Sequence, residues 1–404
     1  MKTDIEAADR GETVSLMEPL LIADDSQHRG ALTDLAFDLT QKSAGFRRSL
    51  PPTLLTSLAD LVRSMNCYYS NLIEGHDTHP VDIERALKND YSQDAHKRDL
   101  QLEAKAHIAV QKWIDGGGLK GGLALKAEGI SEIHRRFCEL LLEDLLWVEE
   151  PATKEKVRLL PGELRKRDVR VGNHVPISPG ALPRFLERFT GVYGNLGKTE
   201  SIISTAAAHH RLLWIHPFMD GNGRVARLMS HAVMLDLLDT GAVWSVARGL
   251  ARSVSEYKSL LSNCDLPRRN DLDGRGTLSE EALAEFTRFF LSICIEQVDF
   301  MESLVQPDRL RARILLWAEE EIRLGHLPAR SSGILEAVLY RGELPRGDAG
   351  TVVGASERQA RRIVSALVDR GVLTSESAYA PLRLIFPAAL ASRWMPGLFP
   401  EKVV

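Results

Sequence analysis

Apolar residues recur every three or four positions along most of this chain, a spacing that predicts helices rather than strands. The clearest run begins after Pro51-Pro52 and stops at Gly75, as helix ends prefer. Its apolar positions are Leu54, Leu55, Leu58, Leu61, Val62, Met65, Leu72 and Ile73. The same spacing predicts helices over 94–114, 130–147, 181–196, 205–215, 224–235 and 290–305. A mainly α-helical protein is therefore expected.

Three stretches lack this helical spacing. Residues 1 to about 50 are polar and have few apolar positions at a regular spacing. We therefore expect a loosely ordered leading segment that packs across the helices. Glycines crowd residues 116–122 and predict a loop or hinge. In residues 163–176, Val169-Arg-Val171 alternates apolar with charged side chains before the Gly172-Asn173 turn signal. This alternation predicts a short β-hairpin.

Residues 307–404 carry a different pattern and are expected to form a separate module. Residues 348–371 read as two short helices around a Gly-Ala-Ser turn, the helix-turn-helix pattern, with Ser356 capping the second. That helix would bury Ala360, Ile363, Val364 and Leu367 and expose Arg358, Arg361 and Arg362. The segments that start at Gly371 and Pro381 read as two strands of a wing. We thus expect three regions, 1–120, 121–306 and 307–404.

The amino-acid composition is typical of a globular enzyme and excludes few classes of function. The 404 residues are 44% apolar and 26% charged. The net charge of −4 argues against a positive electrostatic potential over the whole protein that would attract nucleic acid. The four cysteines lie far apart without a Cys-x-x-Cys pair, which indicates buried thiols in a reducing compartment. The first ten residues lack the apolar core of a signal peptide, and no apolar stretch spans a bilayer. We expect a cytoplasmic protein without a membrane partner.

Residues 216–227, His-Pro-Phe-Met-Asp-Gly-Asn-Gly-Arg-Val-Ala-Arg, concentrate the chemistry of this chain. The glycine turn at 221–223 precedes a predicted helix, whose first N–H groups and positive dipole suit a phosphate. Arg224 and Arg227 lie three apart on one helix face and suit phosphate oxygens. Asp220 offers a hard oxygen ligand for Mg²⁺, and His216 is a natural proton acceptor. The cluster predicts a nucleotidyl- or phosphoryl-transfer site.

This stretch resembles the signature of the Fic family, His-x-Phe-x-(Asp/Glu)-Gly-Asn-Gly-Arg-x-x-Arg, and matches it at every fixed position. The resemblance implies a Fic-type helical bundle that moves AMP from ATP onto a Tyr, Ser or Thr hydroxyl of a protein target, with the protein itself as another target. It implies roles for His216 as general base, Asp220 as the Mg²⁺ ligand, Phe218 as a core plug, and Gly221, Asn222, Gly223, Arg224 and Arg227 as nucleotide-binding residues. Within this set, residues 222–224 would hold the α- and β-phosphates and Arg227 the γ-phosphate.

A second match concerns the end of the first strong helix. Ser70-Asn-Leu-Ile-Glu-Gly75 resembles the inhibitory motif of regulated Fic proteins, (Ser/Thr)-x-x-x-Glu-(Gly/Asn). Ser70 and Glu74 lie four residues apart and share a face of the last helical turn. A carboxylate at this position could form a bidentate pair with an arginine guanidinium. By resemblance the arginine is Arg227, and the pair would withhold it from the γ-phosphate. Judged from the residues alone, such a short match is usually a solvated glutamate at a helix end beside a capping glycine. Beside the complete signature, the inhibitory interpretation of Glu74 is favoured.

The resemblance extends to further features, each with an alternative. The hairpin at 163–176 lies where Fic proteins carry a flap that docks a target segment, whereas Arg165-Lys166-Arg167 reads as a solvated edge. Tyr257 resembles an aromatic residue of the nucleotide base pocket, or is simply packed. His209-His210 reads as core histidines, and the acidic loop 270–280 as a loop that ends in the N-cap Ser279.

Two classes of function follow from these patterns. The first is a self-inhibited protein adenylyltransferase, with relatives that use other nucleotides or remove AMP as variants of it. The second is a DNA-bound regulator whose nucleotide site senses ATP, because a C-terminal winged helix is found in many bacterial Fic proteins. For that module, DNA binding and protein contact or homodimer formation stay open. His216 favours the enzyme, since a sensor needs no base, and Gly223 favours nucleotidyl transfer because it leaves room for the β-phosphate.

Overall fold

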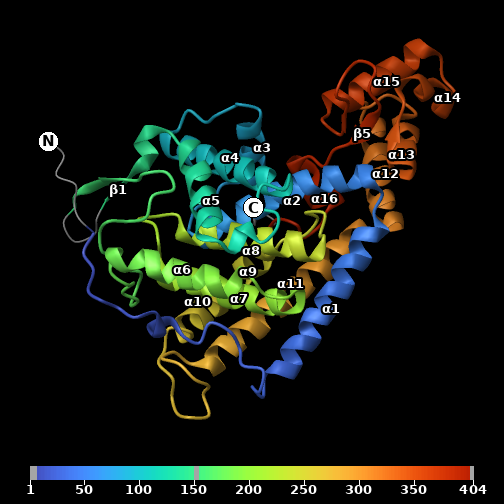
Figure 1. Cartoon of the computed structure of the whole chain (residues 1–404). Helices are drawn as coiled ribbons and strands as arrows, with labels where there is room; N and C mark the ends of the chain where they lie inside the picture. Colours follow the sequence, from blue (N-terminus) through green and yellow to red (C-terminus); the bar gives the residue numbers. More distant parts are fainter. Residues whose placement is uncertain (1–6, 150–153, 401–404) are drawn as a thin grey trace.

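The computed structural model describes residues 7–149 and 154–400, and in that part the chain is mainly α-helical, as predicted (Figure 1). The helices before the C-terminal module are α1 (Arg29–Ser49), α2 (Pro52–Ile73), α3 (Pro80–Leu87), α4 (Ala95–Asp115), α5 (Ala127–Glu139), α6 (Leu182–Tyr193), α7 (Lys198–Ile215), α8 (Asn222–Leu238), α9 (Val246–Arg252), α10 (Val254–Asn263) and α11 (Glu280–Val305). They pack around one extended apolar core. Within the described residues, no helix has the length and apolar character needed to cross a membrane.

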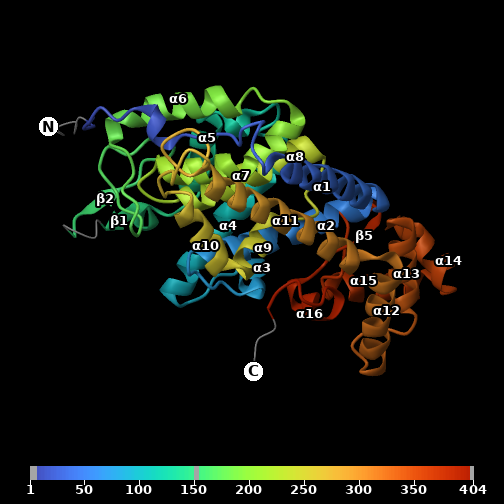
Figure 2. The same ribbon diagram turned by 90° about the horizontal axis from the view of Figure 1, so that it is seen from below.

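Helix α1 corrects the expectation of a loosely ordered leading segment. Its 21 residues pack along α11 and α7, as Figure 2 also shows. Only Leu32, Ala36, Leu39, Ser43 and Phe46 are buried, at helical spacing. So narrow an apolar stripe is a weak signal in the sequence, and the helix is stabilised mainly by the partner that covers the stripe.

Helix α2 forms where the sequence predicted it and lies at the centre of the molecule, against α4 and α9. Its end has the geometry of a Schellman motif. Gly75, at φ +87°, donates to the carbonyl of Leu72 (3.0 Å), and the N–H of His76 donates to that of Asn71 (2.9 Å). Only glycine adopts this φ without strain, so Gly75 ends the helix at a defined point and holds Glu74 as its C-cap.

The β structure near the active centre differs from the prediction. The hairpin consists of β1 (Trp147–Glu149) and β2 (Lys156–Arg158), which pair antiparallel with Val148 opposite Val157. Residues 163–176 instead contain a single bridge between Val171 and His174 around the predicted turn. The predicted helix over 130–147 ends at Glu139, because the leucines that follow do not share a buried face: Leu140 and Leu142 are half-exposed.

The C-terminal module projects from one corner of the helical body (Figure 1). It contains α12 (Pro307–Arg323), α13 (Ser331–Arg341), α14 (Ala349–Val353), α15 (Glu357–Asp369) and α16 (Ala391–Trp394), with strands β3 (Glu343–Leu344), β4 (Leu373–Thr374) and β5 (Leu382–Leu384) in the order β3-β5-β4. Ser356 caps α15 in a capping box with Gln359. The four predicted apolar positions are buried and the three arginines exposed. The elements match the predicted pattern, and the winged-helix assignment stays a prediction.

This module also contacts α2. The hydroxyl of Ser57 donates to the carbonyl of Leu384 (2.5 Å), and that of Tyr69 donates to the carbonyl of Leu398 (2.9 Å). The rings of Tyr68 and Phe399 meet edge to face with centroids 5.7 Å apart. The last described segment of the chain is therefore packed against the turn of α2 that precedes Ser70.

Candidate active site

The predicted signature forms a tight connection between α7 and α8. His216 ends α7 at φ +51°, and Gly221 precedes α8 at φ +82°, so two left-handed residues turn the chain around. The side chain of Asn222 closes the loop, since its Oδ1 accepts from the N–H of Phe218 (3.0 Å) and its Nδ2 donates to the Phe218 carbonyl (2.9 Å). Phe218 is fully buried and stacks on His134 at 3.9 Å. The loop is thereby held rigid from both sides.

His216 is prepared to accept a proton. Its Nδ1 lies 3.3 Å from the carbonyl of Leu213, which can only accept, so Nδ1 carries the proton and the Nε2 lone pair is free. Burial lowers the pKa of His216 to about 4, against the opposing effect of the Leu213 carbonyl and together with the charge of Arg165. The imidazole is therefore neutral at physiological pH, as a general base requires.

Arg165 was missed as a site residue and corrects the interpretation of 165–167 as a solvated edge. Its side chain is 2% exposed, and Nε donates to the carbonyl of His216 (2.8 Å) while Nη2 donates to that of Ile177 (2.5 Å). Its backbone N–H donates to the carbonyl of Pro217 (2.9 Å). Burial lowers the pKa of Arg165 to about 10, so the group stays charged. Arg165 thus connects residues 165–177 to the signature through hydrogen bonds. Of the basic run 165–167, only Lys166 is exposed.

A cavity of about 640 Å³ opens beside His216. Its floor is the signature, residues 216 and 219–224, and its opposite side combines residues 148–149 of β1 with residues 168–171 and 175. Asp220 is half-exposed at this cavity, and Arg224 is buried beside it, with Nη2 3.9 Å from the Asp220 carboxylate. The cavity therefore has a base, a carboxylate, an arginine and the N-terminus of α8 on one side.

The second arginine, Arg227, is held by α2. Its Nη2 donates to Glu74 Oε1 (2.5 Å) and to the Ser70 carbonyl (3.2 Å), and its Nε donates to the Ser70 hydroxyl (2.8 Å). Burial of Glu74 acts to raise its pKa, but the charge and hydrogen bond of Arg227 outweigh burial and hold that pKa below its ordinary value. The contact predicted between the two motifs is thus present, through one carboxylate oxygen.

The carboxylate of Glu74 also covers the start of α8. A Cβ built on Gly223 would collide with Glu74 Oε1 and press on Arg227 Nη1. Glycine at 223 therefore leaves a space above the backbone, and Glu74 now fills it. This is the space that the resemblance reserves for the β-phosphate.

Comparisons with known proteins agree with this geometry. Residues 124–234 match the family model described as Fic/DOC family. This part of the chain is a Fic domain. Over 173 residues the chain is 29% identical to "Protein adenylyltransferase Fic" of Culex quinquefasciatus, covering 42% of the chain and 31% of that protein, and over 116 residues it is 34% identical to that of Drosophila grimshawi, covering 28% and 23%. The chain thus spans less than a third of the length of these curated relatives.

Solved structures show the same fold. A Fic family protein from Desulfovibrio desulfuricans G20 matches with a TM-score of 0.51 at 14% identity, covering 90% of this chain and 98% of that one. Fic-1 of C. elegans, residues 134–508, matches with a TM-score of 0.50 at 17% identity, covering 67% and 72%. At these identities the likeness concerns the fold alone.

Next to the Fic domain lies a charged group that the sequence did not reveal. Glu103 of α4 accepts from His76 (3.0 Å) and lies 3.7 Å from Arg224. Burial acts to raise the pKa of Glu103, but His76 and Arg224 hold it below its ordinary value, and the hydrogen bond to Glu103 raises the pKa of His76. Only the folding of α4 beside α2 brings these groups together, so their sequence spacing carries no signal.

Tyr257, His209, His210 and Asn222 are the remaining residues that the sequence singled out. Tyr257 is 2% exposed, its hydroxyl lies 2.7 Å from Nε2 of His209, and it is not among the described residues that line the cavity. Tyr257 is therefore packed in the core, and its part in a nucleotide base pocket stays a prediction. His209 and His210 are core residues, as expected. The Asn222 side chain is committed to Phe218, so its backbone N–H, not its amide, remains for a phosphate.

Proposed function

We propose that this protein is an adenylyltransferase that moves AMP from ATP to a Tyr, Ser or Thr hydroxyl of a protein. The observation that carries the proposal is His216, a neutral imidazole that lines the cavity and whose Nε2 lone pair can accept a proton. A protein that only senses a nucleotide has no use for a base held in one tautomer. The names of the similar proteins, each a protein adenylyltransferase Fic, support the same reaction.

The reaction follows from the arrangement of these groups. The target hydroxyl oxygen attacks the α-phosphorus of ATP while His216 Nε2 accepts its proton. The new bond joins that oxygen to the α-phosphorus, the bond from the α-phosphorus to the oxygen bridging to the β-phosphate breaks, and pyrophosphate leaves. The first N–H groups of α8 and the guanidinium of Arg224 stabilise the charge that develops on the phosphates.

Mg²⁺ fits the donor set of this cavity. Mg²⁺ usually binds proteins through one or two carboxylates and takes its other ligands from water and substrate phosphates. Asp220 is a half-exposed carboxylate at the cavity, and no cluster of three or more metal-binding side chains occurs in residues 7–149 and 154–400. Asp220 would therefore hold the ion, which would neutralise phosphate charge when bound.

The target segment would lie across the far side of the cavity. Strand β1 and residues 168–171 border it. Strands β1 and β2 form a two-stranded sheet in the described part of the chain, and an extended peptide can join one of its outer edges. We propose that a protein segment, including one from a second copy of this chain, docks there with its hydroxyl toward His216.

Glu74 would restrain the reaction. It occupies the space above Gly223 and keeps Arg227 on α2, so the γ-phosphate lacks its arginine and the triphosphate cannot align for in-line attack. Inhibition would thus act through position rather than through loss of ATP affinity. The match to the Fic model covers residues 124–234, so the restraint comes from outside that segment.

Intact-mass spectrometry tests the proposal directly. Wild type, Glu74→Gly and Glu74→Gly/His216→Ala are incubated with each nucleoside triphosphate and Mg²⁺, alone and with a lysate as the source of targets. We expect an AMP-sized adduct with ATP, greatest in Glu74→Gly and absent in the double variant. Retained transfer in the double variant would overturn the role of His216, and an adduct from another triphosphate would identify a different donor.

One observation favours a second function beside this one. Arg358, Arg361 and Arg362 are exposed on α15, which suits phosphate and base contacts of DNA. The regulator hypothesis requires salt-dependent DNA binding that ATP alters, measured by fluorescence anisotropy with wild type and Arg358→Ala/Arg362→Ala. Equal binding of both proteins would contradict it.

A further inference from the structure

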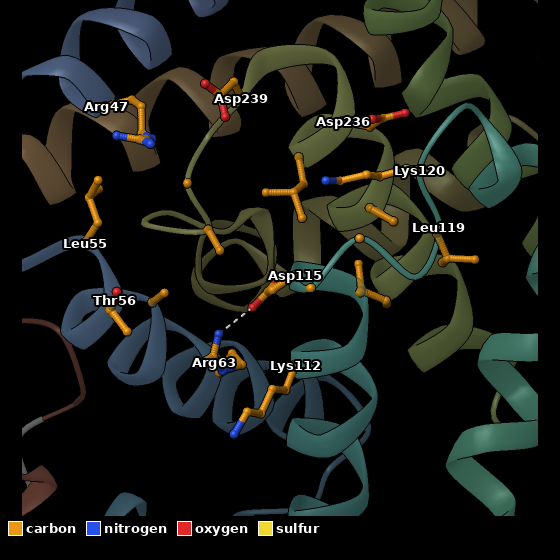
Figure 3. A pocket seen from close by; sticks show the side chains of 18 of the residues that line it. Arg47, Leu55, Thr56, Arg63, Lys112, Asp115, Leu119, Lys120, Asp236 and Asp239 are labelled. Carbon is orange, nitrogen blue, oxygen red and sulfur yellow. Dashed lines mark hydrogen bonds and ion pairs between the residues drawn. The ribbon is translucent and has the colours of Figure 1, made fainter. Parts of the chain in front are cut away.

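A second large cavity lies at the opposite end of α2 and α8 from the active site. Its volume is about 710 Å³, within the usual range for small-molecule sites. Figure 3 shows its walls, which come from the end of α1 and start of α2, the glycine loop after α4, and the turn after α8. Apolar side chains, among them Leu55, Leu119 and Leu235, form much of the surface. The cavity shares no lining residue with the one beside His216.

The charged groups of this cavity are only partly satisfied by one another. Arg63 pairs with Asp115 (2.8 Å), and the carboxylate of Asp236 accepts from the N–H groups of Gly121 (3.0 Å) and Gly122 (3.3 Å). The charged lining residues whose side chains form no hydrogen bond or ion pair within the described part of the chain are Arg47, Lys112, Lys120 and Asp239. Asp236 keeps its charge against the two backbone N–H groups, so the lining holds four cations, Arg47, Arg63, Lys112 and Lys120, and three carboxylates, Asp115, Asp236 and Asp239. This excess of one positive charge favours an anionic ligand.

Arg47 is held in position for such a ligand. A Cβ on Gly241, whose φ is +61°, would collide with Cδ and Nε of Arg47, so the arginine lies directly on the glycine backbone. Its Nε is buried and has no hydrogen-bond partner among residues 7–149 and 154–400. In Figure 3, Arg47 and Lys120 approach the cavity from opposite sides, whereas Lys112 extends away from both. The buried Nε is out of reach of a ligand, but Nη1 and Nη2 are not among the buried atoms, so they are the donors that an anion in the cavity would contact.

We propose that this cavity binds a small organic anion, a carboxylate or a phosphate monoester, with its charged group on Arg47, its apolar part against the leucines, and Lys120 adding attraction from the opposite wall. The volume suits a body the size of an aromatic ring with substituents. This assignment is independent of the reaction at His216.

The site is connected to the inhibitory contact by two helices. Helix α2 runs from the second cavity, at Pro52–Arg63, to Glu74, and α8 runs from Arg227 back to the second cavity. Between the two ends, Asp115 joins the helices, because it pairs with Arg63 of α2 and lies 2.7 Å from His231 of α8. A ligand that fits the cavity in this conformation stabilises the conformation in which Glu74 holds Arg227. This coupling rests on the proposed function.

Four matched probes test the binding site: benzoate, phenyl phosphate, neutral benzyl alcohol and cationic benzylamine. Crystals of the full chain are soaked with each, and affinities are measured by calorimetry without ATP. We expect at least one anion in the cavity with its charged group on Arg47. Its Kd should rise about tenfold or more in Arg47→Ala and in Lys120→Ala, and stay unchanged in Lys97→Ala, an exposed lysine in the first turn of α4, at the end of that helix away from the cavity.

Three outcomes would overturn the site: neither anion occupies the cavity, benzylamine or benzyl alcohol binds there as tightly, or both substitutions leave the anion's Kd unchanged. Hydrogen exchange of residues 66–74 then tests the coupling, with slower exchange expected in the presence of the bound anion. Unchanged exchange would overturn the coupling but not the site. Neither measurement involves ATP, so a failure of the proposed anion site can be distinguished from a failure of the proposed AMP transfer.

Discussion

Replacing Glu74 tests how strongly α2 restrains the active site. Glu74→Gly removes the carboxylate from Arg227 and from the space above Gly223, while the Ser70 contacts remain. Glu74→Gln keeps the shape and one acceptor but removes the charge. The two substitutions therefore separate the charged interaction from the steric one.

The magnitude follows from the contact geometry. The Glu74 side chain is 34% exposed and that of Arg227 is 3% exposed, so solvent screens the pair only in part. A hydrogen bond to a charged group contributes about 1.5–3 kcal/mol, and the amide of Glu74→Gln still accepts from the charged Arg227, so that variant keeps part of this contribution. If AMP transfer requires this contact to open, its removal raises the competent fraction by roughly 10- to 150-fold. Glu74→Gln should therefore give an intermediate rise of several-fold.

The assay is the initial rate of AMP incorporation at saturating ATP, together with ATP affinity measured by calorimetry. We expect the rate order Glu74→Gly, then Glu74→Gln, then wild type, with ATP affinity changed by less than the rate. Glu128→Gln, an exposed glutamate at the start of α5, serves as the control and should match wild type. Equal rates for wild type and Glu74→Gly would refute the restraint, and a large gain in ATP affinity would show that Glu74 excludes ATP instead.

Four further results are expected. Because burial lowers the pKa of His216 to about 4, the transfer rate of Glu74→Gly should be level from about pH 6 to 8, and a rise centred near pH 6.5 would contradict this. Arg165→Lys, which cannot keep the bonds to the carbonyls of residues 177 and 216 together, should lower kcat about tenfold or more with little change in ATP KM, whereas equal losses in both would indicate general damage. Asp220→Asn should raise the Mg²⁺ concentration that gives half-maximal transfer, and an unchanged requirement would exclude it as the ligand. His107 is fully buried with a pKa lowered by burial to about 3, so the unfolded chain binds its proton first as pH falls below about 6.5; Tm should therefore fall with acidification, and fall less steeply in His107→Asn.

The local features were predictable because each depends on neighbours in the sequence. The signature occupies twelve consecutive residues, so its turn, its helix start and the shared face of Arg224 and Arg227 follow from spacing alone. Helix α2 was also predictable, since its broad apolar stripe lies between proline and glycine stops.

Features that depend on a distant partner were not predictable in the same way. Helix α1 carries too narrow an apolar stripe to be recognised without α11, and the hairpin β1–β2 lies upstream of the stretch that alternated most clearly. Arg165 looked like one charge in a solvated run, and only folding placed three backbone carbonyls around its guanidinium.

The residues of the signature can therefore be recognised from the local sequence, whereas the proposed restraint by Glu74 and the second cavity cannot. A histidine, a carboxylate and a glycine turn at set spacing define a phosphate-transfer loop wherever the chain places it, because backbone dihedrals and helix periodicity act over a few residues. The contact of Glu74 with Arg227 joins positions 153 apart, and the second cavity is lined by residues that range from Arg47 to Ala242. Such contacts depend on how helices pack, which is set by the burial of whole apolar faces rather than by any short motif.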